Sequence, residues 1–310
     1  MNDRVLITIV GPTASGKTDL AAAIARYYQT EIISADSRQV YKELNIGVAR
    51  PDPQLLAEIK HHFIASHSVL DDFNAGKFEI AAIAVLEQVF RNHPVAVMVG
   101  GSGLYIKAVC EGLDEIPADS RVRKILQQEL KSRGLPALVD KLRSVDPAYC
   151  SVADLANPRR VLRALEVALS TGRPYSSFRQ GHRKSRNFRI IKIGLALPRN
   201  ELYTRIQQRV DEMMKKGLLE ECRKLLHYKE IPALQTVGYK ELFDYLEGKT
   251  SLPDAVENIK QNTRNFAKRQ MTWFRKDAGI RWFNPEQPQV ILWYLDNLLG
   301  NMRSLAGERT

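Results

Sequence analysis

The chain has 310 residues, 44% of them hydrophobic, and 46 Lys and Arg against 35 Asp and Glu give it a net charge of +11. This length suggests two domains, and the composition is that of a globular protein with a buried core. No stretch reaches the roughly 18 consecutive apolar residues that argue for a membrane-spanning helix. The excess of positive charge predicts a polyanionic partner.

The cysteines and the N-terminal residues indicate the cellular compartment. Cys110, Cys150 and Cys222 are widely spaced and include no Cys-x-x-Cys pair, which disfavours a disulfide framework and a cysteine-based zinc site. The apolar run from Val5 to Val10 lies directly before a glycine-rich loop, so it predicts a first strand rather than a signal peptide. We therefore expect a cytoplasmic protein with reduced thiols and no membrane partner.

Strand-like and helical patterns alternate in the first third of the chain. Apolar runs at residues 5–10, 31–34 and 94–99 accompany an amphipathic helical pattern at about residues 17–28. This alternation predicts a parallel sheet flanked by helices. A further strand-like run at residues 189–197 is followed by long helical patterns, which indicates that the chain returns to the same sheet.

The segment between these two parts has a different character. Residues 118–184 show helical patterns broken by Gly and Pro turns, with hardly any strand-like run. We predict an α/β core with C-terminal helices, formed by residues 1–117 and 185–310, and an all-helical insertion formed by residues 118–184. The insertion holds 14 Lys and Arg against six Asp and Glu, so it carries +8 of the net charge of +11.

A second basic stretch free of acidic residues lies at residues 258–276. At 100° per residue, Lys260, Arg264, Lys268 and Arg275 in this stretch fall within a sector of about 80° on one helix face. Ile259, Phe266 and Trp273 form an opposite apolar stripe. A solvated charged face is the alternative, but two basic patches together favour binding to a nucleic-acid backbone.

The clearest motif follows the first strand. Gly11-Pro12-Thr13-Ala14-Ser15-Gly16-Lys17-Thr18 matches G-x-x-x-x-G-K-[ST] between a predicted strand and a helix, the context that this motif requires. Its N–H groups, the positive end of the following helix and Lys17 favour two linked phosphates, and the hydroxyl of Thr18 is placed to bind Mg²⁺. The motif predicts a P-loop NTPase-like core.

Two further loops follow predicted strands of the same sheet. The run from Val95 to Val99 ends in a glycine turn with Ser102 and not in the aspartate typical of NTPases, which weakens ATP hydrolysis as the function. Asp36 follows residues 31–34 at a strand end beside the phosphate loop, where it could act as a general base or bind a metal. A tight turn is the alternative for the glycine cluster, and a surface aspartate is the alternative for Asp36.

Six motifs follow one another along nearly the whole chain. They are Gly11 to Thr18, Ser34-Ala35-Asp36-Ser37-Arg38-Gln39-Val40-Tyr41, Gly100-Gly101-Ser102-Gly103-Leu104-Tyr105, Asn157-Pro158-Arg159-Arg160 with Arg163-Ala164-Leu165-Glu166, Val237-Gly238-Tyr239, and Lys268-Arg269-Gln270-Met271-Thr272-Trp273-Phe274-Arg275. In this order they resemble the tRNA dimethylallyltransferases, also called tRNA isopentenyltransferases. That family prenylates the exocyclic N6 amine of the adenosine on the 3′ side of the anticodon.

The resemblance implies that the phosphate loop holds the diphosphate of dimethylallyl diphosphate rather than a nucleotide. Lys17, the loop N–H groups and Mg²⁺ would then stabilise the leaving diphosphate. Asp36 would take the proton of the acceptor amine, and Ser102 matches a position that is often threonine. Arg205 resembles the family arginine that faces the diphosphate, with a surface helix arginine as the alternative.

The resemblance also implies contacts with the tRNA anticodon stem-loop, whose target base must be flipped out to be reached. The residues it places there are Asp36, Ser37, Arg38, Gln39, Ser102, Arg123, Lys124, Arg159, Arg160, Arg163, Gly238, Tyr239, Lys268 and Arg275. Any one of the arginines could instead cap a helix or pair with an acid such as Glu166. We expect a monomer.

Three other functions compete with tRNA prenylation. A small-molecule kinase shares the phosphate loop but explains neither basic patch. A prenyltransferase of free adenine nucleotides has no obvious use for a helical insertion of charge +8. A non-catalytic RNA-binding NTPase switch would need an acidic second motif, for which the sequence supplies no good candidate.

Overall fold

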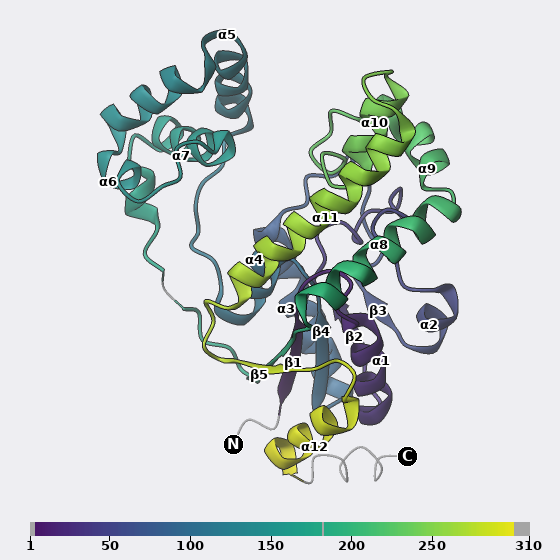
Figure 1. Ribbon diagram of the computed structural model, residues 1–310. Helices are drawn as coiled ribbons and strands as arrows, with labels where there is room; N and C mark the ends of the chain where they lie inside the picture. Colours follow the sequence, from purple (N-terminus) through teal and green to yellow (C-terminus); the bar gives the residue numbers. More distant parts are fainter. Residues whose placement is uncertain (1–3, 182, 301–310) are drawn as a thin grey trace. The chain divides into compact units, whose positions relative to one another are not determined.

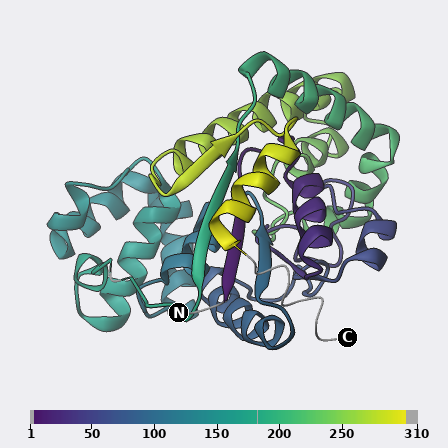
Figure 2. The same ribbon diagram turned by 90° about the horizontal axis from the view of Figure 1, so that it is seen from below.

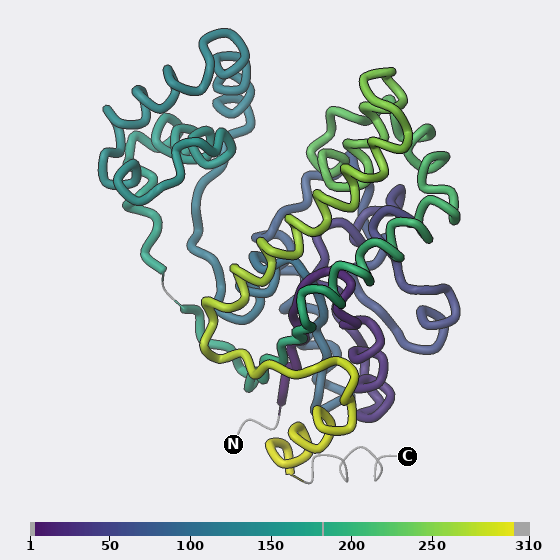
Figure 3. The backbone as a smooth tube through the Cα atoms, viewed as in Figure 1, coloured from purple at the N-terminus to yellow at the C-terminus, as the bar shows by residue number. Residues whose placement is uncertain are grey.

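The computed structural model describes residues 4–181 and 183–300, which separate into two compact units (Figures 1 and 3). The first unit contains residues 4–111 and 185–300, and the second is Gly112–Lys184. The chain leaves the first unit once, forms the second and returns, as the colours of Figure 3 show. The second unit begins at Gly112, whereas the sequence analysis began the insertion at residue 118.

The first unit is built on a six-stranded sheet. Its strands are β1 (Val5–Val10), β2 (Ile32–Ser34), β3 (His61–His62), β4 (Val95–Val99), β5 (Arg189–Leu195) and β6 (Ile280–Phe283). Their order is β3-β2-β4-β1-β5-β6, and every neighbouring pair is parallel. The predicted parallel sheet is therefore confirmed, and the strand predicted after the insertion is β5.

Helices surround this sheet. They are α1 (Lys17–Tyr28), α2 (Pro53–Glu58), α3 (Ala75–Asn92), α4 (Gly103–Glu111), α8 (Arg199–Lys215), α9 (Leu218–Leu225) with the one-turn η2 (Leu226–Tyr228), α10 (Tyr239–Leu246), α11 (Leu252–Phe274) and α12 (Pro288–Leu299). No helix in the described part of the chain is long and apolar enough to cross a membrane.

Helices cover both faces of the sheet (Figure 2), and alternate residues of β1 face opposite layers. Ile7 and Ile9 pack in one buried cluster with α1 and α12. Thr8 points to the other side, where its Oγ1 lies 3.8 Å from Sγ of Cys110 on α4. Both faces of the sheet are thus covered, which is typical of parallel sheets and explains the continuous apolar runs of the strands.

Within the first unit, helix α12 packs against β1 and α1. Ile291, Leu295 and Leu299 recur at intervals of four residues and are buried in the same cluster as β1. The carboxylate of Asp296 accepts hydrogen bonds from the hydroxyls of Tyr27 and Tyr28 on α1. One apolar face and one polar anchor therefore hold this helix against α1.

All regular structure in the described part of the second unit is helical, as predicted. It comprises α5 (Ser120–Val145), α6 (Pro147–Cys150), α7 (Pro158–Thr171) and the 3₁₀ helix η1 (Tyr175–Phe178). Gly134 interrupts α5 with φ of +76°, two residues before Pro136, so the two halves of α5 run in different directions. Leu126, Leu142 and Leu165 contribute to the buried core between α5 and α7.

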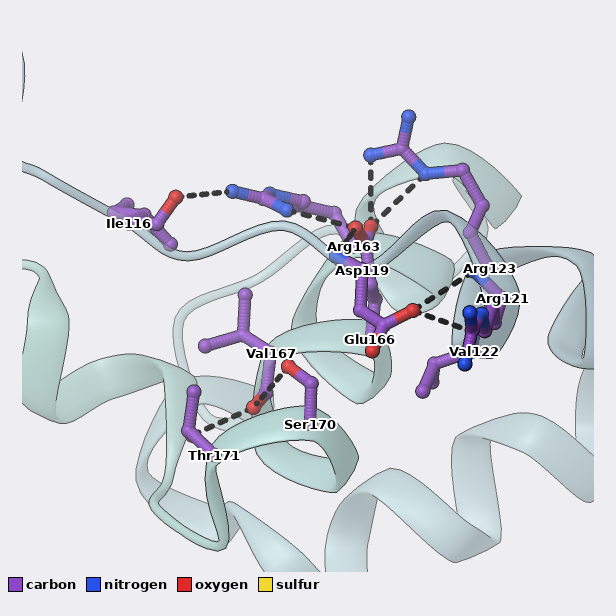
Figure 4. Close-up of polar contacts among 10 residues, drawn as sticks. All are labelled: Ile116, Asp119, Arg121, Val122, Arg123, Arg163, Glu166, Val167, Ser170 and Thr171. Atoms are coloured by element: carbon purple, nitrogen blue, oxygen red, sulfur yellow. Dashed lines mark hydrogen bonds and ion pairs between the residues drawn. The ribbon is translucent and has the colours of Figure 1, made fainter.

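A buried carboxylate joins the start of the second unit to α7 (Figure 4). The side chain of Glu166 is 1% exposed, and its Oε2 accepts hydrogen bonds from Nε and Nη2 of Arg123 at 3.0 and 2.7 Å. Its Oε1 accepts one from N of Asp119 at 2.9 Å and lies 3.1 Å from Nη1 of Arg163. Arg163 also donates to the carbonyl of Ile116. Glu166 thus organises the chain where it enters α5.

We expect Glu166→Gln to destabilise the second unit by about 3 kcal/mol, because it leaves two arginines without their buried counter-charge. The matched variant Glu129→Gln breaks more exposed ion pairs with Arg133 and Lys141, and it should cost less than about 1 kcal/mol. Urea unfolding followed by far-UV circular dichroism measures both changes. Equal losses in the two variants would contradict the role assigned to Glu166.

Candidate active site

The phosphate loop connects β1 to α1, as its motif predicted. Gly11 has φ of +150°, and a Cβ there would lie 2.8 Å from the carbonyl oxygen of Leu195. Gly16 has φ of +81° and is the N-cap residue of α1. Both conformations favour glycine, and Ala14 between them also has a positive φ of 63°. The loop therefore ends at a free helix N-terminus, where an anion is stabilised.

Lys17 is held inside this loop. Its Nζ donates a hydrogen bond to the carbonyl of Pro12 at 2.6 Å. Burial and the positive charge of Arg209 lower the pKa of Lys17 from 10.5 to about 7, while the negative charge of Asp36 opposes this shift. The hydroxyl of Ser15 is buried and lacks a hydrogen-bond partner among the described residues. The loop thus holds a desolvated cation and a spare hydroxyl, as an anion site would.

Asp36 lies in a tight turn directly after β2. Its Oδ1 accepts hydrogen bonds from the backbone N of Arg38 at 2.8 Å and of Gln39 at 3.3 Å. The amide of Gln39 in turn donates to the carbonyls of Val48 and Ala49. These bonds fix the carboxylate of Asp36 at the carboxyl edge of the sheet and use the side chain of Gln39 to support a neighbouring loop.

The loop after β4 packs directly against this turn. A Cβ at Gly100 would lie 2.1 Å from the carbonyl oxygen of Ala35, so the close approach requires glycine. The hydroxyl of Ser102 accepts a hydrogen bond from N of Ser37 at 2.9 Å and donates one to the Ser37 hydroxyl at 3.1 Å. Ser102 is therefore hydrogen-bonded to the residue that follows Asp36, although Ser102 and Asp36 are 66 positions apart in the sequence.

A cavity of about 530 Å³ opens above these loops. Predicted site residues on its wall are Thr13, Asp36, Ser37, Arg38, Ser102 and Gly238. Residues on its wall that the sequence analysis did not assign to the site include Val48, Tyr105, Arg209, Met213, Thr236, Thr263, Arg269 and Gln270. Phe266 and Trp273, predicted as part of an apolar stripe on α11, also lie on this wall and are 39% and 46% exposed.

The structure places Arg209, not Arg205, on the cavity wall with Asp36. Arg205 is paired with Glu201 at 2.7 Å and with Glu286 at 2.9 Å, and it lines a separate hollow. Burial lowers the pKa of Arg209, and the carboxylate of Asp36 opposes this shift. The two arginines lie one helical turn apart on α8, and only their distant partners distinguish them. The diphosphate contact of Arg205 stays a prediction, and Arg209 is the arginine of α8 that shares a cavity wall with Asp36.

Tyr239 requires a correction. Its side chain is fully buried, and its hydroxyl donates to Oε1 of Glu221 at 2.6 Å, so this ring cannot contact a bound RNA. The same carboxylate accepts hydrogen bonds from N of Ile46 and Gly47, so Tyr239 helps to anchor that loop. Gly238, the N-cap residue of α10 with φ of +97°, remains on the cavity wall.

The other predicted RNA contacts divide into exposed and internally paired cations. Lys124, Arg159 and Arg160 in the second unit are exposed, and so are Lys268 on α11 and Arg275 directly after it. Arg123 and Arg163 are paired with Glu166, which is the alternative that the sequence analysis left open for them. Arg163 is 27% exposed and Arg123 is 48% exposed, so pairing takes more of Arg163 away from solvent.

The fold and the site define a P-loop NTPase-like α/β protein with a carboxylate and a hydroxyl beside its phosphate loop. The family model described as IPP transferase matches residues 39–277. The chain is 52% identical to the tRNA dimethylallyltransferase of Christiangramia forsetii, over 94% of this chain and 97% of that protein. It is 47% identical to tRNA dimethylallyltransferase 1 of Bacteroides fragilis, over 95% of this chain and 98% of that protein.

Solved structures agree with these relatives. The full-length tRNA isopentenylpyrophosphate transferase of Bacillus halodurans matches with a TM-score of 0.70 and 34% identity, covering 98% of this chain and all of that one. A eukaryotic dimethylallyltransferase acting on tRNA matches with a TM-score of 0.75 and 25% identity, covering 91% of this chain and 74% of that one. The chain belongs to the tRNA dimethylallyltransferase family, and it is a transferase.

The lowered pKa of Lys17 can be tested directly. In the protein without metal or diphosphate, we expect the Lys17 amine to react with an acylating reagent with a midpoint near pH 7. Arg209→Gln should raise this midpoint, because it removes a neighbouring positive charge, and Asp36→Asn should lower it, because it removes a negative one. Mass spectrometry of the peptide containing Lys17 gives the rates. A wild-type midpoint near 10.5 would contradict this assignment.

Proposed function

We propose that this transferase moves the dimethylallyl group of dimethylallyl diphosphate to the exocyclic N6 amine of an adenosine in tRNA, on the 3′ side of the anticodon. The observation that supports it most is one cavity wall that joins the phosphate loop, at Thr13, to Asp36 and Ser102. The phosphate loop can bind the diphosphate leaving group there, and Asp36 can act as the base for the acceptor amine. The family of the chain supports this reaction.

Binding of the diphosphate uses the positive charge of the site. Cleavage of the allylic C–O bond builds negative charge on the diphosphate, so cations fixed beside it lower the barrier. Lys17 in the loop and Arg209 on the cavity wall are the residues placed for this role. Neither forms a covalent bond to the substrate.

The residues present fit a magnesium ion bound mainly through the substrate. Mg²⁺ keeps several waters and is often held by substrate phosphates with few protein ligands. In the described part of the chain, no three His, Cys, Asp or Glu side chains form a metal cluster, so a closed protein cage is not the expected site. The exposed Thr18 at the start of α1 would hold the ion. Mg²⁺ would add positive charge at the leaving diphosphate.

The acceptor amine needs a base, because its lone pair is delocalised into the purine ring. Asp36 has one carboxylate oxygen engaged by the backbone of its own turn, which orients the group and leaves Oδ2 to accept the amine proton. The Ser102 hydroxyl, held by Ser37, is the neighbouring polar group for the base. General-base catalysis of this kind contributes about 10²–10⁴-fold.

We expect the acceptor adenosine to enter the cavity flipped out of its stack. Extruding a base costs a few kcal/mol, which contacts with the RNA backbone must offset. For those contacts we propose exposed cations of the second unit and of the C-terminal end of α11, namely Lys124, Arg159, Arg160, Lys268 and Arg275. With tRNA as the substrate the protein would act in the cytoplasm. One chain supplies all residues proposed for catalysis, so a monomer suffices.

A transfer assay tests this proposal. Labelled dimethylallyl diphosphate should modify unmodified tRNA in the presence of Mg²⁺ and should leave AMP unlabelled. Under saturating single-turnover conditions, Asp36→Asn should slow transfer by about 10²–10⁴-fold, because the base is lost. Asp140→Asn, an exposed carboxylate in the second unit, is the matched control and should retain the rate. Label in AMP alone, or ATP turnover without transfer, would overturn the proposal in favour of a nucleotide prenyltransferase or a kinase.

The choice between the two arginines of α8 gives a separate prediction. We expect Arg209→Gln to slow transfer by about 10²–10³-fold, because a cation beside the leaving group is lost. Arg205→Gln breaks only partly exposed ion pairs and should change the rate less than about fivefold. Both variants are compared at saturating donor and tRNA. The reverse order of effects would return the diphosphate contact to Arg205.

A further inference from the structure

Gln270 connects two of the loops that form the site. It lies on α11, and its side chain is buried, with 7% of the residue exposed. Its Oε1 accepts a hydrogen bond from N of Thr13 in the phosphate loop at 2.8 Å. Its Nε2 donates to the carbonyl of Gly101 after β4 at 3.0 Å. The oxygen of this amide group therefore binds the phosphate loop, and its nitrogen binds the glycine turn that carries Ser102.

The surroundings of Gln270 are built to admit this amide. A Cβ at Gly101 would lie 2.2 Å from its Nε2, so a glycine is needed where the amide approaches the backbone. A buried amide needs hydrogen-bond partners wherever it lies, and filling the core is the simplest alternative role. Here, however, both partners belong to the catalytic loops, and Gln270 lies on the cavity wall with Asp36.

The contacts continue from Gln270 to the general base. Gly101 directly precedes Ser102 in the chain. The hydroxyl of Ser102 accepts a hydrogen bond from N of Ser37, and Ser37 follows Asp36. On the other side, Thr13 belongs to the loop that holds Lys17. A short series of hydrogen bonds through Gln270 therefore connects the phosphate loop to the loop of Ser102 and the turn of Asp36.

We propose that Gln270 is a positioning residue that sets the gap between the prenyl carbon of the donor and the amine of the acceptor. This inference rests on the proposed prenyl transfer. A carbon with carbocation character reacts with the group that is nearest when the C–O bond breaks. The amine attack forms a C–N bond and releases diphosphate and a proton to Asp36, whereas water attack forms dimethylallyl alcohol and releases diphosphate and a proton. A wider gap favours water.

The ratio of dimethylallyl alcohol to prenylated tRNA should therefore rise when the gap between donor and acceptor widens. We expect Gln270→Ala to raise the ratio about tenfold or more and to lower kcat for transfer by about 10–100-fold, because small displacements of reacting atoms have effects of this size. The KM values for donor and tRNA should change little. Gln270→Glu keeps an acceptor for N of Thr13 but cannot donate to Gly101, so it should raise the ratio as well.

Gln261→Ala on the exposed side of the same helix is the matched control and should keep the wild-type ratio. Partial unfolding of a variant removes both products equally and leaves the ratio unchanged, so the ratio separates positioning from loss of structure. An unchanged ratio in Gln270→Ala and Gln270→Glu, with wild-type protein active, would overturn the inference. If Gln270→Ala does not fold, Gln270→Glu decides alone. Absence of transfer by the wild type would instead overturn the proposed function.

Discussion

The close approach of two backbone segments at the carboxyl edge of the sheet is the constraint on which the site depends. Strands β2 and β4 are parallel neighbours, so the loops that follow them leave the sheet side by side. Any side chain at Gly100 would collide with the carbonyl of Ala35. Because glycine stands there, Ser102 reaches the turn of Asp36 and the two polar groups share one wall. The site therefore depends on the order of the strands and on glycine at position 100, which has no Cβ.

The charges of the site are unbalanced in the free protein. Lys17 and Arg209 are both desolvated, both have a lowered pKa, and the carboxylate of Asp36 partly opposes each shift. Burial disfavours the charged form of both groups, and the positive charge of Arg209 also lowers the pKa of Lys17, so the two cations mark a region of positive potential. In the proposed reaction a diphosphate would bring the negative charge that this region lacks. The electrostatics proposed to bind the donor would then also stabilise the charge that develops on the leaving group.

Features carried by contiguous residues were predictable from the sequence, and features carried by distant pairs were not. The phosphate loop and the turn of Asp36 follow strands directly, so strand order alone places them at one edge. Arg205 and Arg209 share a helix and a residue type, and their difference depends on Glu286, 81 residues from Arg205. Gln270 lies within one of the sequence motifs, but its hydrogen-bond partners Gly101 and Thr13 lie 169 and 257 residues before it. Tyr239 was misassigned because a motif does not reveal burial.

The first turn of α7 shows how the charge of the second unit is arranged. Asn157 caps this helix, Pro158 begins it, and the exposed Arg159 and Arg160 follow at once. Cations near a helix N-terminus oppose its macrodipole, each by about 0.3–1 kcal/mol. Glu166, nearly two turns further on, is buried and engaged by Arg123 and Arg163, so it is not available to neutralise the exposed pair. Because Glu166 is the only acidic residue of α7, the first turn of this helix keeps positive charge that no carboxylate of its own helix neutralises.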